Sequence, residues 1–110
     1  MPMNSVYSAA EPSRAELDAL KQATLVEFGA PWCGYCRAAQ PLLAAALADH
    51  PAVHHTKIED GPGRRLGRSF GVKLWPTLVF LRDGKEVSRL VRPRDPEAIA
   101  VMLERLDARA

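Results

Sequence analysis

Residues 25–43, LVEFGAPWCGYCRAAQPLL, decide the fold. The stretch begins with a short apolar run, which predicts a buried strand, and Gly29 and Pro31 end that run. After the turn the composition becomes rich in alanine and leucine, which favours a helix. Cys33 and Cys36 are the only cysteines of the chain. We therefore expect them where the chain leaves a strand and enters a helix.

The rest of the chain predicts alternating helices and strands. We expect helices over residues 13–22, 33–49 with a kink at Pro41, 64–70, and a last one capped by Asp95, and strands over residues 24–28, 52–58, 77–81 and 85–91. A crossover helix between strands implies parallel pairing, whereas the Asp83-Gly84 turn implies an antiparallel hairpin. The fold class is therefore α/β, with a central mixed β-sheet flanked by helices on both faces.

Length and composition favour one domain over residues 1–110, in which residues 1–10 are irregular or form a short strand. The chain is 47% hydrophobic and 25% charged, which is enough for a core that needs no disulfide or metal. With 6% aromatic residues and a net charge of +2, we expect no nucleic-acid partner. No apolar run approaches the roughly 18 residues of a membrane span, and the N-terminal residues do not resemble a secretory signal. We therefore expect a cytoplasmic protein that does not contact a membrane.

A Cys-x-x-Cys pair at the start of a helix has a specific chemical use. Cys33 lies where free backbone N–H groups and the positive end of the helix dipole stabilise an anion, which favours a reactive thiolate. Cys36 lies about one turn further along and can attack a mixed disulfide formed at Cys33, which releases the substrate. The pattern predicts a redox dithiol that requires no metal and no organic cofactor.

The spacing also raises the alternative of a zinc site. Cys33 and Cys36 are followed by His50 and His54, at a spacing close to that of a Cys2His2 zinc finger. In a finger the cysteines lie on a hairpin and the histidines on a helix, whereas here the cysteines open the helix and His54 follows its end. We therefore expect no metal site, and we place these two histidines and His55 at the surface or at strand ends.

In order, type and spacing, the chain resembles the thioredoxin family from residue 13 onward. The matching stretches are residues 25–43, residues 70–87 (FGVKLWPTLVFLRDGKEV) and the last helix. The Trp-Cys-Gly-x-Cys motif, the proline five residues after it and the Pro76-Thr77 pair are jointly specific. The resemblance implies a thioredoxin fold and a thiol–disulfide oxidoreductase that reduces or exchanges disulfides in protein substrates.

The resemblance also implies roles for residues around the dithiol. A cis peptide before Pro76 would face Cys33 and expose backbone to an extended substrate. Glu27, a carboxylate inside an apolar strand, would lie beneath Cys36 and act as its general base, with Lys57 on the next strand as its partner. The family further implies a monomer and, as a partner, a flavin-dependent thioredoxin reductase.

The substrate-binding residues are expected to surround the cysteines: Trp32, Gly34, Tyr35, Trp75, Pro76, Thr77 and Arg92. Several departures from the family pattern lie among them. Tyr35 replaces a proline of typical thioredoxins, Trp75 replaces a smaller aliphatic residue, and Arg92 replaces a common glycine. Gly29 replaces an aromatic residue, which we expect to open space near the site. These departures leave open an alternative function, a thioredoxin-like docking module with weak turnover.

Overall fold

The computed structural model describes residue 3, residues 6–8 and residues 10–107. The helices and strands of this part are α1 (Arg14–Asp18), β1 (Thr24–Gly29), α2 (Gly34–Leu47), β2 (His54–Glu59), α3 (Arg65–Ser69), β3 (Thr77–Arg82), β4 (Lys85–Val91) and α4 (Pro96–Asp107). The strands form a sheet in the order β2-β1-β3-β4. Strand β1 pairs with β2 in parallel and with β3 antiparallel, and β3 pairs antiparallel with β4. The predicted mixed sheet is confirmed.

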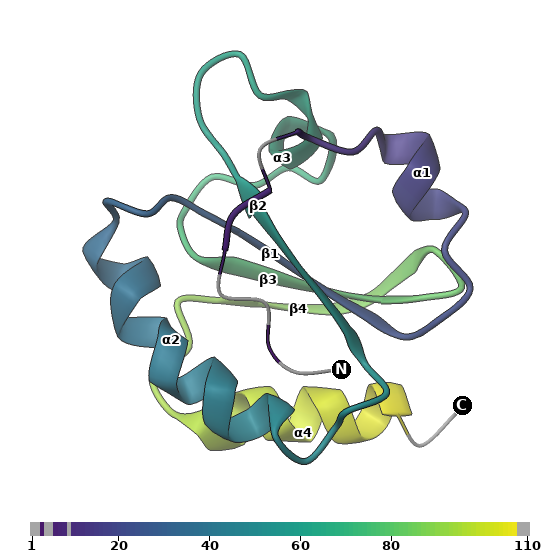
Figure 1. The fold of residues 1–110 in the computed structure, drawn as a ribbon, viewed down its shortest axis with the longest axis vertical. Helices are drawn as coiled ribbons and strands as arrows, with labels where there is room; N and C mark the ends of the chain where they lie inside the picture. The colour runs from purple at the N-terminus through teal and green to yellow at the C-terminus, as the bar shows by residue number, and fades with distance from the viewer. Residues whose placement is uncertain (1–2, 4–5, 9, 108–110) are drawn as a thin grey trace.

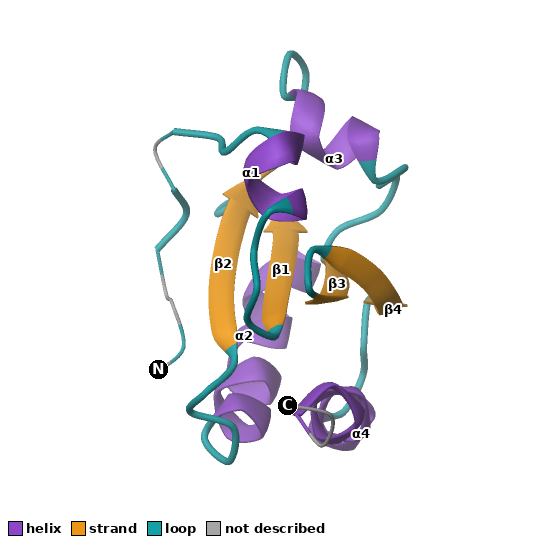
Figure 2. Cartoon of the chain, turned by 90° about the vertical axis from the view of Figure 1, so that its right-hand side faces the viewer, coloured by secondary structure: helices purple, strands orange, loops and turns teal. Residues whose placement is uncertain are grey.

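Helices cover both faces of the sheet, as Figures 1 and 2 show. Side chains alternate between the two faces along each strand. Leu25 and Leu78 pack with α2 and α4 in one buried cluster. Val26 and Val79 pack in a second cluster that includes Leu17 of α1 and residues of α3. The Cys33–Cys36 segment lies at the carboxyl end of β1, where this strand leaves the sheet.

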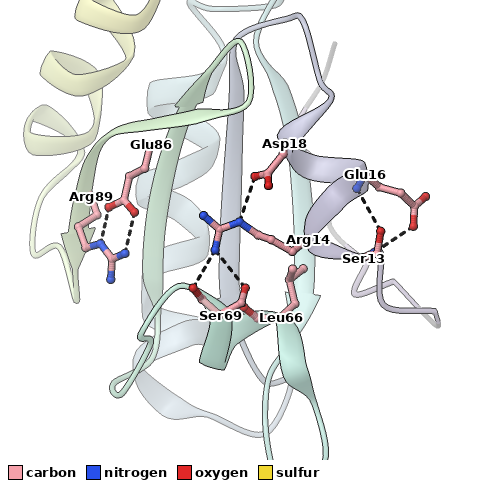
Figure 3. Close-up of polar contacts among 8 residues, drawn as sticks. All are labelled: Ser13, Arg14, Glu16, Asp18, Leu66, Ser69, Glu86 and Arg89. Atoms are coloured by element: carbon pink, nitrogen blue, oxygen red, sulfur yellow. Dashed lines mark hydrogen bonds and ion pairs between the residues drawn. The ribbon is translucent and has the colours of Figure 1, made fainter.

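The predicted first helix is too long, since α1 ends at Asp18 rather than at residue 22. The expected capping box of Ser13 and Glu16 is present (Figure 3). Arg14 joins α1 to α3, because its guanidinium donates to the carbonyl of Ser69 at 2.7 Å. The helix stops where its last carbonyl, that of Asp18, meets the turn between β3 and β4.

Other expected boundaries differ by a few residues. Strand β2 begins at His54 rather than at residue 52, because the N–H of Val53 is engaged in a turn with the carbonyl of His50. Pro41 lies inside α2, and Asp95 accepts a hydrogen bond from the N–H of Ala98, as a capping residue does.

The N-terminal segment lies beside β2, the edge strand, in both Figure 1 and Figure 2. The expected irregular segment or short strand covers residues 1–10. Residues 3, 6–8 and 10 have no regular secondary structure, and residues 1–2, 4–5 and 9 lie outside the described residues. The N–H of Ser8 nevertheless donates to the carbonyl of Lys57 at 3.0 Å. None of the helices in the described ranges has the length and hydrophobicity needed to cross a bilayer.

The turn at Gly84 generates a stability prediction. Gly84 has φ +77°, and a Cβ there would lie 1.9 Å from the carbonyl oxygen of Asp18. Gly63 has φ +79°, with open space around its missing Cβ. Gly63→Ala should therefore cost only the backbone strain, about 1–2 kcal/mol. Gly84→Ala should cost at least about 3 kcal/mol in urea unfolding, because α1 must also move. Equal losses for the two variants would contradict the close packing.

Candidate functional site

The two cysteines open α2 as expected. Cys33 is the N-cap residue, and its Sγ accepts a hydrogen bond from the N–H of Cys36 at 3.2 Å. Both thiols are free, and their exposed fractions are 8% for Cys33 and 1% for Cys36. Negative charge is stabilised at the N-terminus of a helix, so the arrangement favours a thiolate at Cys33. Cys36 lies behind it, hidden from solvent.

Burial makes Cys36 hard to ionise. It raises the pKa of the Cys36 thiol to about 12, and the neighbouring Cys33 sulfur adds to the rise. A hydrogen bond from the backbone of Ala30 and one from the Tyr7 hydroxyl lower this pKa in part. A cleft of about 200 Å³ reaches Cys36 from the side, and Tyr7, Arg37, Gln40 and Lys57 are among the residues that line it. Polar side chains therefore line the space beside the buried thiol.

Glu27 is fully buried beneath α2. Its Oε2 accepts a hydrogen bond from Nε2 of Gln40 at 2.9 Å, and the same amide nitrogen donates to the carbonyl of Cys36 at 2.7 Å. Lys57 is the partner of Glu27 in the parallel register, with its Nζ 3.9 Å from Oε2, and it donates to Oε1 of Gln40 at 2.8 Å. One amide thus connects the buried carboxylate, the ammonium group and the helix turn of Cys36.

His55 gives a correction to the sequence analysis. It was expected at the surface or a strand end; it is the second residue of β2, near the start of the strand, but it is buried rather than exposed, and its Nε2 lies 2.9 Å from Oε1 of Glu27. His50 lies 2.7 Å from Asp107 Oδ2, and His54 bonds Thr56 at 2.9 Å. Over the described ranges no three His, Cys, Asp or Glu side chains are grouped as metal ligands. The spacing that raised the zinc alternative thus does not correspond to a cluster.

Two tryptophans lie beside the cysteines. Trp75 is half-buried and packs against Ala30, Cys33 and Cys36. Its indole N–H donates to Asp60 at 2.9 Å, which fixes the ring. Trp32, which was expected beside the cysteines, is 67% exposed and meets Trp75 edge to face, with ring centroids 5.3 Å apart. The aromatic surface beside Cys33 thus comes from both rings, with Trp75 as the anchored one.

Arg92 contacts both Tyr35 and Trp75. The Arg92 guanidinium lies 3.9 Å from the centroid of the exposed Tyr35 ring, and its Nε donates to the carbonyl of Trp75 at 2.7 Å. Arg92 has φ +51°, a left-handed conformation that favours glycine, which gives a physical reason for the glycine common at this position. Tyr35, Trp75 and Arg92 form the rim of the site. Arg92 connects the other two residues of the rim rather than extending freely into solvent.

The remaining expected site residues lie around the same opening. The Trp75–Pro76 peptide bond is cis, and the N–H of Arg92 donates to the carbonyl of Pro76 at 3.0 Å. The Thr77 hydroxyl donates to the carbonyl of Leu74 at 2.6 Å at the start of β3. Gly34, the first residue of α2, has open space where a Cβ would lie.

Sequence reasoning missed three residues of this site. Gln40 follows Cys36 by four residues, which places both on one face of α2. His55 precedes Lys57 by two residues, which places both on one face of β2, so each spacing could have indicated a shared face. Tyr7 comes from an irregular segment, and no local pattern relates it to the cysteines. Its ring lies 4.4 Å from the ammonium group of Lys57.

Comparison with known proteins assigns the family. The sequence pattern of the family described as Thioredoxin matches residues 6–105. The chain belongs to the thioredoxin family. Thioredoxin of Chlamydia muridarum is 37% identical over 81 residues, which cover 74% of this chain and 79% of that protein. Human protein disulfide-isomerase A2 is 45% identical over 89 residues, which cover 76% of this chain but 17% of that much longer protein.

A solved structure is closer still in sequence. Thioredoxin 2 from Pseudomonas aeruginosa PAO1 in its reduced form is 59% identical, with a TM-score of 0.87, and the match covers 98% of this chain and 100% of that one. These relatives, together with the adjacent Cys33 and Cys36 thiols, make this thioredoxin-family protein a thiol–disulfide oxidoreductase.

The buried thiol generates a pH prediction. Between pH 6 and 11, thiolate absorbance should show no ionisation of Cys36 below about pH 10, taken as the difference between wild type and Cys36→Ser. Because the fold favours the protonated thiol, its stabilising contribution is complete below the ordinary pKa of 9.0 and declines as the pH rises toward about 12. A difference titration with a midpoint near 9 would contradict the effect of burial.

Proposed function

We propose that the protein reduces or exchanges disulfide bonds in other proteins, with Cys33 as nucleophile and Cys36 as resolving thiol. The observation that carries this proposal is the position of Cys33 Sγ, which accepts the N–H of Cys36 at the N-terminus of α2. A thiolate is stabilised there, and the second sulfur lies within one helical turn. No metal and no organic cofactor enters the reaction.

The reaction has two exchange steps. The Cys33 thiolate attacks one sulfur of the substrate disulfide, a bond forms between them, and the other substrate sulfur leaves with the bonding electron pair. Cys36 then attacks Cys33 Sγ, which closes the Cys33–Cys36 disulfide and releases the second substrate sulfur as a thiolate that takes up a proton. The substrate gains two electrons, and the dithiol loses two.

Glu27 acts as the general base for Cys36 in this proposal. Its burial and its bond to Gln40, which also contacts the carbonyl of Cys36, support the role. Lys57 Nζ lies 3.9 Å from Oε2 of Glu27 and His55 Nε2 lies 2.9 Å from Oε1, so both oxygens of the carboxylate have polar neighbours. The high pKa of Cys36 explains why a base is needed.

The rim selects the substrate in this proposal. An extended segment would lie beside the backbone at Pro76 and Thr77, against the aromatic surface of Trp32 and Trp75. Gly34 and Tyr35 of α2, together with Arg92 just after β4, would flank this path. Because the Arg92 guanidinium is already bonded to the Trp75 carbonyl, it narrows the opening and adds positive charge there. This favours disulfides in exposed, acidic or neutral segments.

Some expectations stay predictions. The flavin-dependent thioredoxin reductase as electron donor and the monomeric state rest on the family resemblance. The cytoplasmic location is likewise an expectation from the sequence alone.

An insulin reduction assay with dithiothreitol tests the main proposal. Wild-type protein should accelerate insulin precipitation, and Cys33→Ser should abolish the acceleration, because the attacking sulfur is lost. Cys36→Ser should instead accumulate a mixed disulfide between Cys33 and the substrate, visible by mass spectrometry. Binding of insulin without turnover by the wild type would favour the docking-module alternative.

Glu27→Gln tests the general base. The amide keeps the shape but cannot accept a proton, so insulin reduction should slow by about tenfold or more at neutral pH. Glu104→Gln, on the exposed surface of α4, removes a carboxylate elsewhere and should leave the rate unchanged. If the Glu27 variant matched the wild type across pH 6–9, the carboxylate would have no part in proton transfer.

A further inference from the structure

Two side chains, those of Cys36 and Tyr7, fill the space that a side chain at position 29 would occupy. A Cβ at this position would lie 2.6 Å from Sγ of Cys36 and 3.0 Å from the hydroxyl oxygen of Tyr7. The resolving sulfur and the phenol therefore converge on the same point beside β1. The expected opening near the site is thus occupied by a side chain that arrives from the N-terminal segment.

Two contacts to the same residue hold Tyr7 in place. Its ring lies under the ammonium group of Lys57, with Nζ 4.4 Å from the ring centroid. The next residue, Ser8, donates its N–H to the carbonyl of Lys57 at 3.0 Å. The Tyr7 hydroxyl itself is buried beside Sγ of Cys36, and it makes no hydrogen bond of good geometry among the described residues. A buried hydroxyl so weakly satisfied is costly, unless its contact strengthens during the reaction.

The groups that face this hydroxyl determine what it can do. Glu27 of β1, the sulfurs of Cys33 and Cys36 at the start of α2, and Lys57 of β2 surround it, and Arg37 lines the same cleft. Burial raises the pKa of Tyr7, and the negative charges of Glu27 and of the ionised cysteines raise it further. The phenol therefore remains protonated at neutral and mildly alkaline pH and acts as a donor rather than as a base.

We propose that the Tyr7 hydroxyl donates a hydrogen bond to Sγ of Cys36 as its thiolate forms, and so positions and stabilises the resolving sulfur. This inference rests on the proposed function and adds a residue to its second step. The proton of Cys36 passes to Glu27, the thiolate attacks Cys33 Sγ, and the substrate sulfur leaves with the electron pair. Tyr7 keeps its own proton throughout, and its weak contact with the Cys36 sulfur becomes a full hydrogen bond as the charge forms.

Tyr7→Phe tests the proposal, because it removes the hydroxyl and keeps the ring under Lys57. Reduced protein mixed with excess dithiobis-nitrobenzoate should release nitrothiobenzoate in two phases. The first phase reports attack by Cys33 and scales with reagent concentration. The second phase reports attack by Cys36 on the mixed disulfide and is independent of reagent concentration.

In Tyr7→Phe the second phase should slow by about three- to tenfold, and its pH profile should move alkaline by about one to two pH units. The rate falls less than the thiolate fraction, because a more basic thiolate is a better nucleophile. The first phase should remain unchanged within about twofold. Ser8→Ala removes a hydroxyl from the same segment and should leave both phases as in the wild type. Thermal unfolding of each variant establishes that the fold is retained.

The outcomes separate the two proposals. Wild-type kinetics with both phases, and identical kinetics in Tyr7→Phe, would overturn the role of the hydroxyl and leave the proposed function standing. Equal slowing of both phases would also overturn it, since that result indicates a structural role of the segment. A wild type that releases no second nitrothiobenzoate would refute the Cys36 resolving step and this inference with it.

Discussion

The burial of one carboxylate constrains most of the site. Glu27 lies in the central strand with no exposed surface, and an isolated charge there would be strongly destabilising. The surrounding elements therefore each supply a polar partner: Gln40 from α2, and His55 and Lys57 from β2. These partners fix how the helix that carries the cysteines lies over the sheet.

The sequence predicted the elements that depend on local patterns. A strand, a Cys-x-x-Cys turn, a helix and the Asp83-Gly84 hairpin each have short-range signals, and the sheet follows from their order. The network around Glu27 was only partly predictable. Lys57 came from a family resemblance. The two-residue spacing places His55 on the same face of β2 as Lys57, but its contact with Glu27 also depends on the parallel register, which no local pattern encodes. A polar residue in an apolar strand indicates that a buried hydrogen-bonding partner exists, but it does not indicate which residue is that partner.

The predicted helix boundary that was wrong also reflects a contact between residues distant in the sequence. Helix α1 ends early because a carbonyl of Asp18 meets a turn about 65 residues later in the chain, at Gly84. At the rim, the sequence identified Trp75 and Arg92 as departures but not the bond between them. That bond gives Arg92 a structural role, since it organises the neighbouring backbone and does not simply add a charge. Tertiary contacts of this kind override or redefine what a residue type favours locally.

The hydrogen bond from Ser8 to Lys57 has a consequence for association between molecules. Strand β2 is an edge of the sheet, and an edge with free backbone groups is a template on which a second chain adds a strand. The N-terminal segment engages one of those groups and lies along the strand (Figure 2). A purification tag or a truncation that displaced residues 6–8 would therefore uncover a site for intermolecular strand pairing, and it would favour aggregation.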